Sequence, residues 1–470
     1  MSTHQSSSGL NEQDDPRLKR DLTLWNSFAL GFAFISPIVA LFGVLALGLT
    51  TVGPGFWWGF VITLLGQSLV ALSFFPLARR WPFEGSSYQW SRRLVSEGWG
   101  WFHGWIYIVT MVVALSIIAL QASQFTLPLL GIKGASQTQL VISSLVLIMF
   151  STIANAWGKR VLHIFVTLCV WAEVVGSLGL GTVLLFFYRK NDLSVFSQGL
   201  SFPGWSHLMY APIVIAMAYA AWGLIGFDSA ASIAEEVKNP HRDVPRGILL
   251  SLIAVGITVA YAGFAFILAI PNLQEVVAGK VADPIVFTLS AIWPSWLVNA
   301  VLFDFTIAFV ACLVAVQAAA ARMIWAFARD NDLPKSAFLV KMSNTQMPVN
   351  AVLVTGVISS ALFVFTGSGI YIMLLALATA GYYIVFFFPV VGTMIARRRG
   401  NVIDKNELPR WHSSVNAAAL LWLIFMIPVI LWPRTPDIPW WQNWGAFTGW
   451  AIVLVLGVIV RKSVLATRHK

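Results

Sequence analysis

Long apolar segments recur along almost the whole chain and are separated by short polar loops. A run of about 20 apolar residues is long enough to cross a bilayer as a helix. The pattern therefore predicts an all-α polytopic membrane protein with twelve transmembrane helices. We expect these spans at residues 24–48, 56–78, 101–128, 138–157, 161–188, 208–236, 247–270, 294–328, 349–366, 370–396, 414–433 and 443–460.

The composition agrees with a single membrane domain. Of the 470 residues, 58% are hydrophobic and 11% are charged, whereas soluble domains carry about 25% charged residues. We place the domain at residues 23–462. Residues 1–22 are polar, lack the basic-then-apolar pattern of a signal peptide and predict a disordered tail. Residues 463–470 predict a second short tail.

The basic residues are distributed unevenly between the two sides of the predicted bundle. With a cytoplasmic N-terminus, 25 of the 30 Lys and Arg residues fall on the inner side and 5 on the outer side. This asymmetry predicts a plasma (inner) membrane protein with both termini in the cytoplasm. The net charge of +10 is thereby explained by inner loops facing the lipid bilayer, and we expect no nucleic-acid partner.

The sixth span contains an interruption near its middle. Gly223 and Gly226 fall within four residues of each other, and Asp228 follows immediately. Glycine weakens a helix, and a charge at this depth costs about 3 kcal/mol on insertion scales. A helix broken in mid-membrane, with Asp228 in the first turn of its second half, accounts for both features. The alternative is a glycine-packed helix interface with one paired acid.

The first span is interrupted as well, because Pro37 follows Ser36 in the middle of the apolar run. Proline removes an amide donor and clashes with the preceding turn. Interrupted helices at corresponding positions of two halves are typical of inverted-repeat transporters. We therefore expect a five-plus-five arrangement with one repeat at 23–190, a second at 205–400, and two further helices at 412–462.

Three ordered motifs at span ends resemble the amino acid–polyamine–organocation permease superfamily. They are PFEGSSYQWSRRL after span two, GFDSAASIAEEVKNPHRDVPRGI in and after span six, and AAAARMIWAFARDNDLP at the inner end of span eight. The resemblance covers roughly residues 20–465 and is strongest to the branch of amino acid, GABA and choline permeases. It implies a twelve-helix inverted-repeat fold, with substrate held between broken helices 1 and 6.

The resemblance also implies which residues bind substrate. Backbone amides at the first break would face a substrate carboxylate. Trp222 matches an aromatic residue that gates substrate in a member of the superfamily, and Asp228 matches an acid that follows the glycine there. The implied substrate-binding residues are Ala33, Phe34, Ile35, Ser36, Trp222, Gly223, Gly226 and Asp228.

Three acids lie at membrane depth in the predicted spans: Glu173, Asp228 and Asp304. Each is either hydrogen-bonded within the bundle or functional, binding a substrate amine or carrying a proton. We place Asp228 first for either role, with Asp304 as the reserve substrate-binding residue and Glu173 as a coupling or gating residue. Many proton-coupled members carry a lysine in span five, and this chain has none there.

The leading hypothesis is a secondary-active permease for an amino acid or a related amine such as GABA, working by alternating access with proton-coupled uptake. An organic-cation transporter for choline or polyamines and an amino-acid exchanger are the alternatives. A membrane enzyme is a remote one, because HExxH, GxSxG and P-loop motifs are absent from the sequence. An amino-acid sensor is equally remote. We expect neither a metal nor a cofactor.

Overall fold

The protein is an all-helical bundle in the part of the chain that its structure describes. The computed structural model describes residues 20–83, 85–132, 134–281, 283–365, 370–400, 408–434 and 439–468. Within these ranges, eleven helices are long and apolar enough to cross a membrane, and a shorter apolar helix, Val349–Val364, lies at the predicted ninth span. The twelve predicted spans are thus found in order.

Most spans are continuous helices. Glycine, proline or a change of helix type marks the ends of several of them, and short helices connect them at both ends of the bundle. The continuous spans are α4 (Trp57–Arg80), α6 (Glu97–Leu129), α7 (Gln137–Trp157), α11 (Pro240–Ala269), α14 (Ser295–Arg329), α16 (Val349–Ala361), α17 (Ile370–Arg399), α18 (Arg410–Leu431) and α20 (Gly445–Arg468). The connecting helices include α3 (Leu45–Thr51), α5 (Ser87–Leu94), α12 (Leu273–Val277), α13 (Pro284–Ile292), α15 (Ser336–Leu339) and α19 (Trp440–Asn443).

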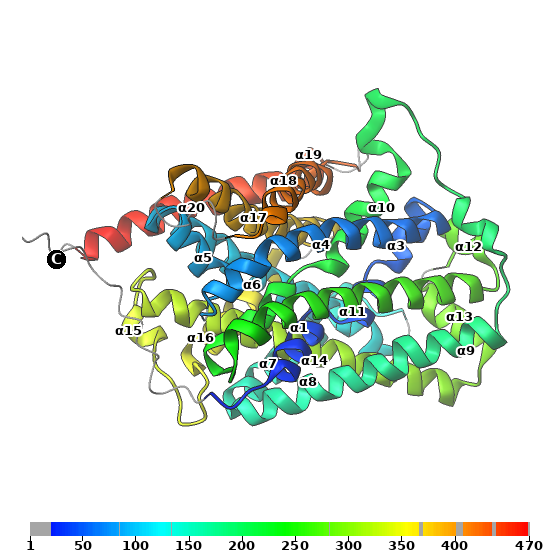
Figure 1. Ribbon diagram of the computed structural model, residues 1–470. Coiled ribbons are helices and arrows are strands. Elements are labelled where there is room, and N and C mark those ends of the chain that lie inside the picture. The colour runs from blue at the N-terminus through cyan, green and yellow to red at the C-terminus, as the bar shows by residue number, and fades with distance from the viewer. Residues whose placement is uncertain are drawn as a thin grey trace, which may run out of the picture.

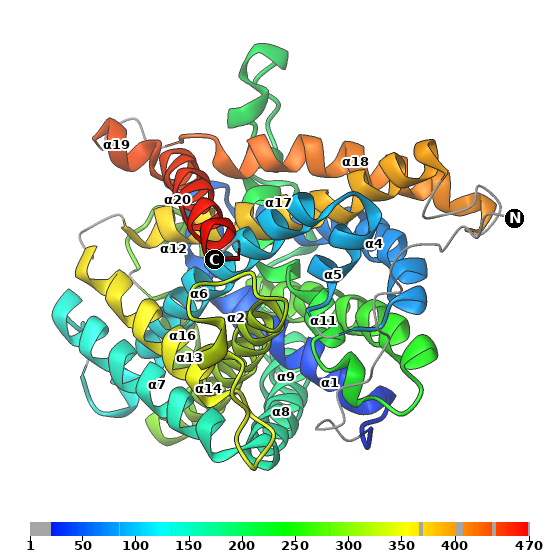
Figure 2. The same ribbon diagram turned by 90° about the vertical axis from the view of Figure 1, so that its left-hand side faces the viewer.

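The helices run side by side between two ends of the bundle. In Figure 1 they cross the picture from left to right, with α5, α15 and the C-terminus at the left and α3, α12 and α13 at the right. Figure 2 looks onto the left-hand end, where α18 and α20 lie on one side and α7 and α8 on the opposite side. We call the left-hand side of Figure 1 the α5 end.

Small residues allow close packing in the middle of the bundle. In α14, the four consecutive alanines from Ala318 to Ala321 are buried, and small side chains let helix backbones approach closely. Large apolar residues at the periphery are exposed instead: Trp157 of α7 is 70% exposed and Phe187 of α9 (Leu180–Phe187) is 77% exposed. This distribution is the one expected for a bundle surrounded by lipid.

The first span is broken where the sequence predicts. α1 (Leu24–Ile35) ends at Ser36, and α2 (Pro37–Phe42) begins immediately afterwards. Ser36 has φ 49° and ψ 109°, a positive φ that is uncommon for a residue other than glycine. Pro37 suits the first position of the second segment, because its missing amide would have no partner there.

The sixth span is broken more extensively than a glycine kink would produce. α10 (Pro212–Ala220) tightens into the 3₁₀ turn Ala221–Leu224, and Gly226 then adopts the left-handed conformation with φ 74°. The chain continues through 3₁₀ turns Phe227–Ala231 and Ala234–Glu236 before α11 begins. The part of span six after the break is thus 3₁₀ and not α-helical, and Asp228 lies in its first turn.

A third irregularity, in span five, was not anticipated. α8 (Lys159–Glu173) passes into a π-helical turn, Val174–Gly179, before α9 begins. π-turns inside α-helices occur frequently at functional sites. This one starts directly after Glu173, one of the three acids that the sequence places in the membrane.

The two predicted tails differ from expectation at their edges. Residues 1–19 lie outside the described residues, but Leu22 forms an isolated parallel bridge with Val237 beside the end of span six. At the other end, α20 continues as a helix to Arg468, beyond the predicted boundary at residue 462.

Candidate substrate site and its acidic neighbours

The breaks in spans one and six pack directly against each other. A Cβ atom on Gly226 would lie 2.1 Å from Cε1 of Phe34, and one on Gly223 would lie 2.9 Å from Cβ of Ala40. The Phe34 carbonyl also accepts a hydrogen bond from the Cys312 thiol of α14, at 3.2 Å. A side chain at either glycine would therefore meet a side chain of span one.

A small internal cavity lies beside these breaks. Its volume is about 20 Å³, which is room for roughly one water molecule. In this conformation the cavity is therefore too small to hold an amino acid. Its lining is almost entirely apolar and comes from spans one, three, six, eight and ten: Phe34, Ile35, Val39, Ala114, Ile118, Trp222, Ile225, Val316 and Tyr382.

Two lining residues bring polar atoms that lack a partner. Within the described part of the chain, neither Nε1 of Trp222 nor the hydroxyl of Tyr382 has a hydrogen-bond partner, although both atoms are buried. Buried polar groups are usually paired, so these two are available to a ligand or a water. Tyr382 packs edge-on against Phe34 and Tyr107, with ring centroids 6.2 and 5.9 Å apart.

Glu173 reaches from span five into the break of span one. Its carboxylate accepts hydrogen bonds from the Ser36 hydroxyl, from the Ile38 amide at 3.0 Å and from the Ser177 hydroxyl at 2.7 Å. The side chain is only 1% exposed. A carboxylate with three donors is stabilised inside the bundle. The Ile38 amide, directly after the break, is thus bonded to Glu173 in this conformation.

Asp304 lies beside the π-turn of span five and not at the cavity. A Cβ on Gly176 would lie 2.2 Å from Oδ2 of Asp304, and this oxygen is buried with no hydrogen-bond partner among the described residues. Asp304 is not among the residues that line the cavity.

Asp228 is fully buried on the α5 side of the break. Its Oδ2 accepts hydrogen bonds from the Tyr107 hydroxyl at 2.8 Å and the Ser87 hydroxyl at 3.0 Å. Its backbone carbonyl accepts one from the Ser86 hydroxyl, also at 3.0 Å. The acid therefore ties the break in span six to α5 and α6, and it contacts the cavity only indirectly, because Tyr107 packs on the lining residue Tyr382.

A buried histidine extends this hydrogen-bonded chain. Nε2 of His103 lies 3.2 Å from the Ser87 hydroxyl, and its Nδ1 lies 2.7 Å from the Ser91 hydroxyl. All three side chains are fully buried. The sequence contains no signal for this contact, since an isolated histidine near a span end normally sits at the membrane interface.

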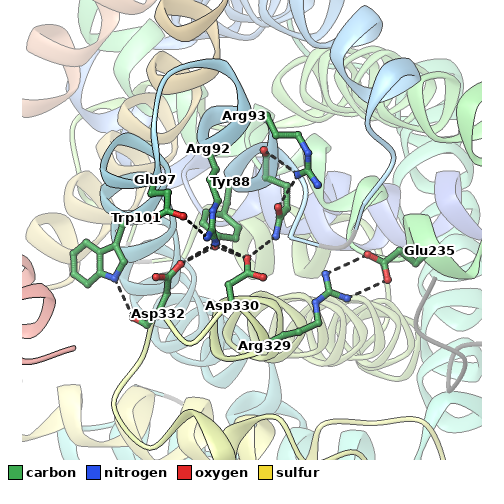
Figure 3. A network of polar contacts seen from close by, with 10 residues as sticks. Tyr88, Arg92, Arg93, Glu97, Trp101, Glu235, Arg329, Asp330 and Asp332 are labelled. Carbon is green, nitrogen blue, oxygen red and sulfur yellow. Dashed lines mark hydrogen bonds and ion pairs between the residues drawn. The ribbon is translucent and has the colours of Figure 1, made fainter. Parts of the chain in front are cut away.

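Next to these hydrogen-bonded residues, a group of charged side chains closes the α5 end of the bundle (Figure 3). The Tyr88 hydroxyl lies 2.7 Å from Asp330 and 3.0 Å from Asp332 and shares its one proton between them, and Arg92 lies 3.0 and 3.2 Å from the same two carboxylates. Gln89 adds a bond to Asp330 at 2.9 Å. Burial and the adjacent carboxylates raise the pKa of Tyr88 well above its usual range, so its hydroxyl stays protonated and donates. We call these five residues the α5–α14 network.

The double acid after span six is held by further ion pairs at the same end. Glu235 pairs with Arg329 at 3.2 Å, as Figure 3 shows. Glu236 is buried and pairs with Arg322 at 3.1 Å and with Lys159 at 2.6 Å. Removing one partner of a buried ion pair is strongly destabilising, so these contacts fix the end of span six to spans five and eight.

The architecture defines the class of protein. A bundle of membrane helices in which two spans, five apart along the chain, break against each other at an internal cavity is typical of secondary transporters. The sequence model of the amino acid permease family matches residues 22–458. The chain therefore belongs to the amino acid permease family.

Several curated proteins are similar to most of this chain. The branched-chain amino acid permease BcaP of Lactococcus lactis subsp. cremoris is 29% identical over 367 residues, which cover 74% of this chain and 75% of the relative. The amino-acid permease BAT1 homolog of Oryza sativa subsp. japonica is 26% identical, covering 89% and 87%. The amino-acid permease BAT1 of Arabidopsis thaliana is 24% identical, covering 88% and 86%.

The residues proposed from sequence fall into three groups. Three line the cavity: Phe34, Ile35 and Trp222. Four lie in or next to the breaks that adjoin it: Ala33, Ser36, Gly223 and Gly226. The three acids lie outside the lining: Glu173, Asp228 and Asp304. Sequence reasoning missed the remaining lining residues, because apolar and aromatic side chains in a membrane span look like ordinary packing: Val39, Ala114, Ile118, Ile225, Val316 and Tyr382.

Proposed function

We propose that the protein is a secondary-active permease that carries a neutral amino acid with an apolar side chain across the plasma membrane, together with a proton. Transport follows alternating access, with the α5 end and both termini in the cytoplasm. The observation that carries the proposal is the contact of two broken spans beside an internal cavity. Irregular backbone at membrane depth is tolerated only where it is buried in protein or lines a cavity.

The cavity lining supports an apolar substrate side chain. None of the nine lining residues is charged, and a charged substrate side chain would be costly to bury there without a partner. The name of the Lactococcus lactis relative, a branched-chain amino acid permease, points in the same direction.

The polar end of the substrate is assigned to the breaks. We place its carboxylate at the backbone around Ser36, which it would share with Glu173. The ammonium group is placed over Trp222, whose ring can attract a cation, beside the backbone carbonyls at Gly223. Glu173 then acts as the gating acid, because its hydrogen bonds hold the two halves of span one in their present relation.

Asp228 is assigned the coupling proton. Its Oδ2 is bound by hydroxyl groups, whereas its Oδ1 is buried and has no hydrogen-bond partner within the described residues. Such a site can hold the carboxylate, which accepts through Oδ2, and also the neutral acid, whose proton can lie on the oxygen that faces Ser87. Asp304, which lies away from the cavity, is the reserve candidate for this role.

A competition screen tests the substrate assignment. Purified protein in liposomes loaded with L-leucine should exchange it for external radiolabelled L-leucine. Unlabelled isoleucine and valine should compete, whereas arginine, glutamate, GABA and choline should not. Uptake of radiolabelled choline that no amino acid inhibits would support the second candidate, an organic-cation transporter, and would overturn the proposal. Trp222 favours that second candidate, since an aromatic face also suits a quaternary ammonium group.

A further inference from the structure

A buried chain of hydroxyl and imidazole groups leads away from Asp228 toward the α5 end. We propose that His103 relays the coupling proton between Asp228 and water at that end, through the hydroxyls of Ser87 and Ser91. The inference rests on the proposed function, because it needs Asp228 to carry a proton. It adds a path for that proton and gives a function to His103, which has no other role in the site.

When Asp228 is ionised, the available donors and acceptors fix the direction of every hydrogen bond between Asp228 and Ser91. A carboxylate only accepts, so Ser87 donates to Oδ2 across 3.0 Å. The Ser87 oxygen then accepts from Nε2 of His103 at 3.2 Å, and Nδ1 is left to accept from Ser91 at 2.7 Å. Each group donates toward the carboxylate, as a path for proton delivery or release requires.

With a proton on Oδ2 of Asp228, every bond in the chain can run in the opposite direction, provided that His103 carries its proton on Nδ1 in place of Nε2. The carboxyl proton of Asp228 passes to the Ser87 oxygen, and the Ser87 proton passes to Nε2 of His103. The proton on Nδ1 of His103 passes to the Ser91 oxygen, and the Ser91 proton leaves to water. Every group gains one proton and loses one, so the net change is the movement of one proton from Asp228 to water. Imidazole suits the middle position because it donates from one nitrogen and accepts at the other.

The far end of the chain lies under the α5–α14 network. Ser91 is buried on α5, and the same helix is held by Tyr88, Gln89 and Arg92 to the carboxylates of Asp330 and Asp332 (Figure 3). While these contacts hold, Ser91 is shielded from water. Opening them on the way to the inward-facing state would admit water and allow release, so that the proton leaves only when that end opens.

Among the described residues, the groups that face His103 and the two serines are aromatic rings and hydroxyl groups. Tyr107 on α6 donates to the same Oδ2 of Asp228, and Tyr382 on α17 packs against Tyr107. From α17 the ring of Phe388 covers His103, with centroids 5.3 Å apart. The acids of the α5–α14 network are bound by Tyr88 and Arg92. A neutral imidazole is favoured in these surroundings because burying an unpaired charge is costly.

The test compares two modes of transport in the full-length protein in liposomes. Leucine-for-leucine exchange needs no net proton movement, whereas uptake driven by an inward proton gradient needs release at the α5 end. His103→Gln keeps hydrogen bonding but cannot shuttle a proton. We expect it to retain exchange of radiolabelled L-leucine and to slow gradient-driven uptake and luminal acidification by about 100-fold, the lower range for loss of a proton-transfer group. Ser91→Ala should show the same split.

The control is His207→Gln, an exposed histidine in the loop before span six, which should leave both modes unchanged. Normal gradient-driven uptake in His103→Gln or in Ser91→Ala would overturn the relay. So would an equal loss of exchange and uptake in both variants, because the side chains would then only support the fold. Failure of the proposed function looks different, since the unmodified protein itself would then show no leucine exchange or no proton-driven uptake.

Discussion

Trp222 is the single residue whose loss should weaken substrate recognition most selectively. It lines the cavity from the edge of the break in span six, and its indole nitrogen has no partner among the described residues. We expect Trp222→Ala to raise KM for L-leucine about tenfold, through lost burial and loss of the cation–π contact. Trp171→Ala, at a 64% exposed tryptophan, is the control. Unchanged uptake kinetics in the Trp222 variant would remove this residue from the site.

Asp228→Asn separates charge from shape at the coupling site. Asparagine can still accept from Tyr107 and Ser87, but it cannot carry the proton. We expect proton-driven uptake to fall by about 100-fold and its remaining pH dependence to become flat between about pH 5 and 8. Exposed Asp192→Asn serves as the control. Normal uptake by Asp228→Asn at every pH in that range would make Asp228 a structural acid.

At the residue scale, the sequence could predict what is chemically unusual and little else. Glycine, proline and an acid inside an apolar run identified Ser36, Gly226 and Asp228, because each is costly in an ordinary membrane helix. The partners of those residues were invisible. Tyr382 lines the cavity and His103 contacts Ser87 only because separate helices pack together. Neither contact can be recognised from the pattern of residues in the sequence.

Among the elements, the break in span six depends on a glycine with a left-handed backbone. In Gly226→Ala the new methyl group would meet the Phe34 ring at 2.1 Å, at a φ of 74°. The backbone strain alone costs about 1–2 kcal/mol, and the contact with span one adds to it. We expect a lower melting temperature and loss of leucine exchange. Gly204→Ala has a φ of 95° and no atom within 4 Å, so it should show the strain without the loss of exchange. Normal exchange in Gly226→Ala would contradict this account of the break.

The α5–α14 network should set how often the α5 end opens. Arg92→Ala removes three ion pairs of a partly exposed arginine, to Glu97, Asp330 and Asp332. Together they are worth about 1 kcal/mol, and hence about a fivefold change in population. We expect maleimide to label Ser229→Cys, a buried position next to Asp228, about fivefold faster in that background. Arg93→Ala, which removes a bond to Gln89 of the same helix, should not change the labelling rate. Equal rates in all three backgrounds would exclude the network as a gate.

The positions of the membrane spans could be predicted from the sequence because the length of each apolar run decides them. The local backbone geometry within the spans could not be predicted in this way. All twelve spans lie where the apolar runs predict them. The π-turn after Glu173 and the 3₁₀ turns after Gly226 depend on packing instead. Glu173 is bonded to span one and Gly176 accommodates Asp304, and these long-range contacts decide the local backbone.

For the molecule as a whole, the protein belongs to the amino acid permease family, and one internal cavity is lined by spans one, three, six, eight and ten. Both facts support a single transport mechanism. In the proposed mechanism the breaks hold the substrate and Asp228 holds the proton, while ion pairs close the α5 end. The lack of a lysine in span five sets this chain apart from many proton-coupled members of the superfamily it resembles. The acids Glu173 and Asp228 are proposed to do that work here.

The most direct measurement is net uptake of radiolabelled L-leucine into liposomes that contain the purified protein, with imposed gradients as the variable. An inward proton gradient should drive accumulation above the external concentration, with acidification of the lumen in step with leucine entry. A sodium gradient alone should drive none. Accumulation with sodium only, or exchange without any net uptake under a proton gradient, would contradict the account of a proton-coupled amino acid permease.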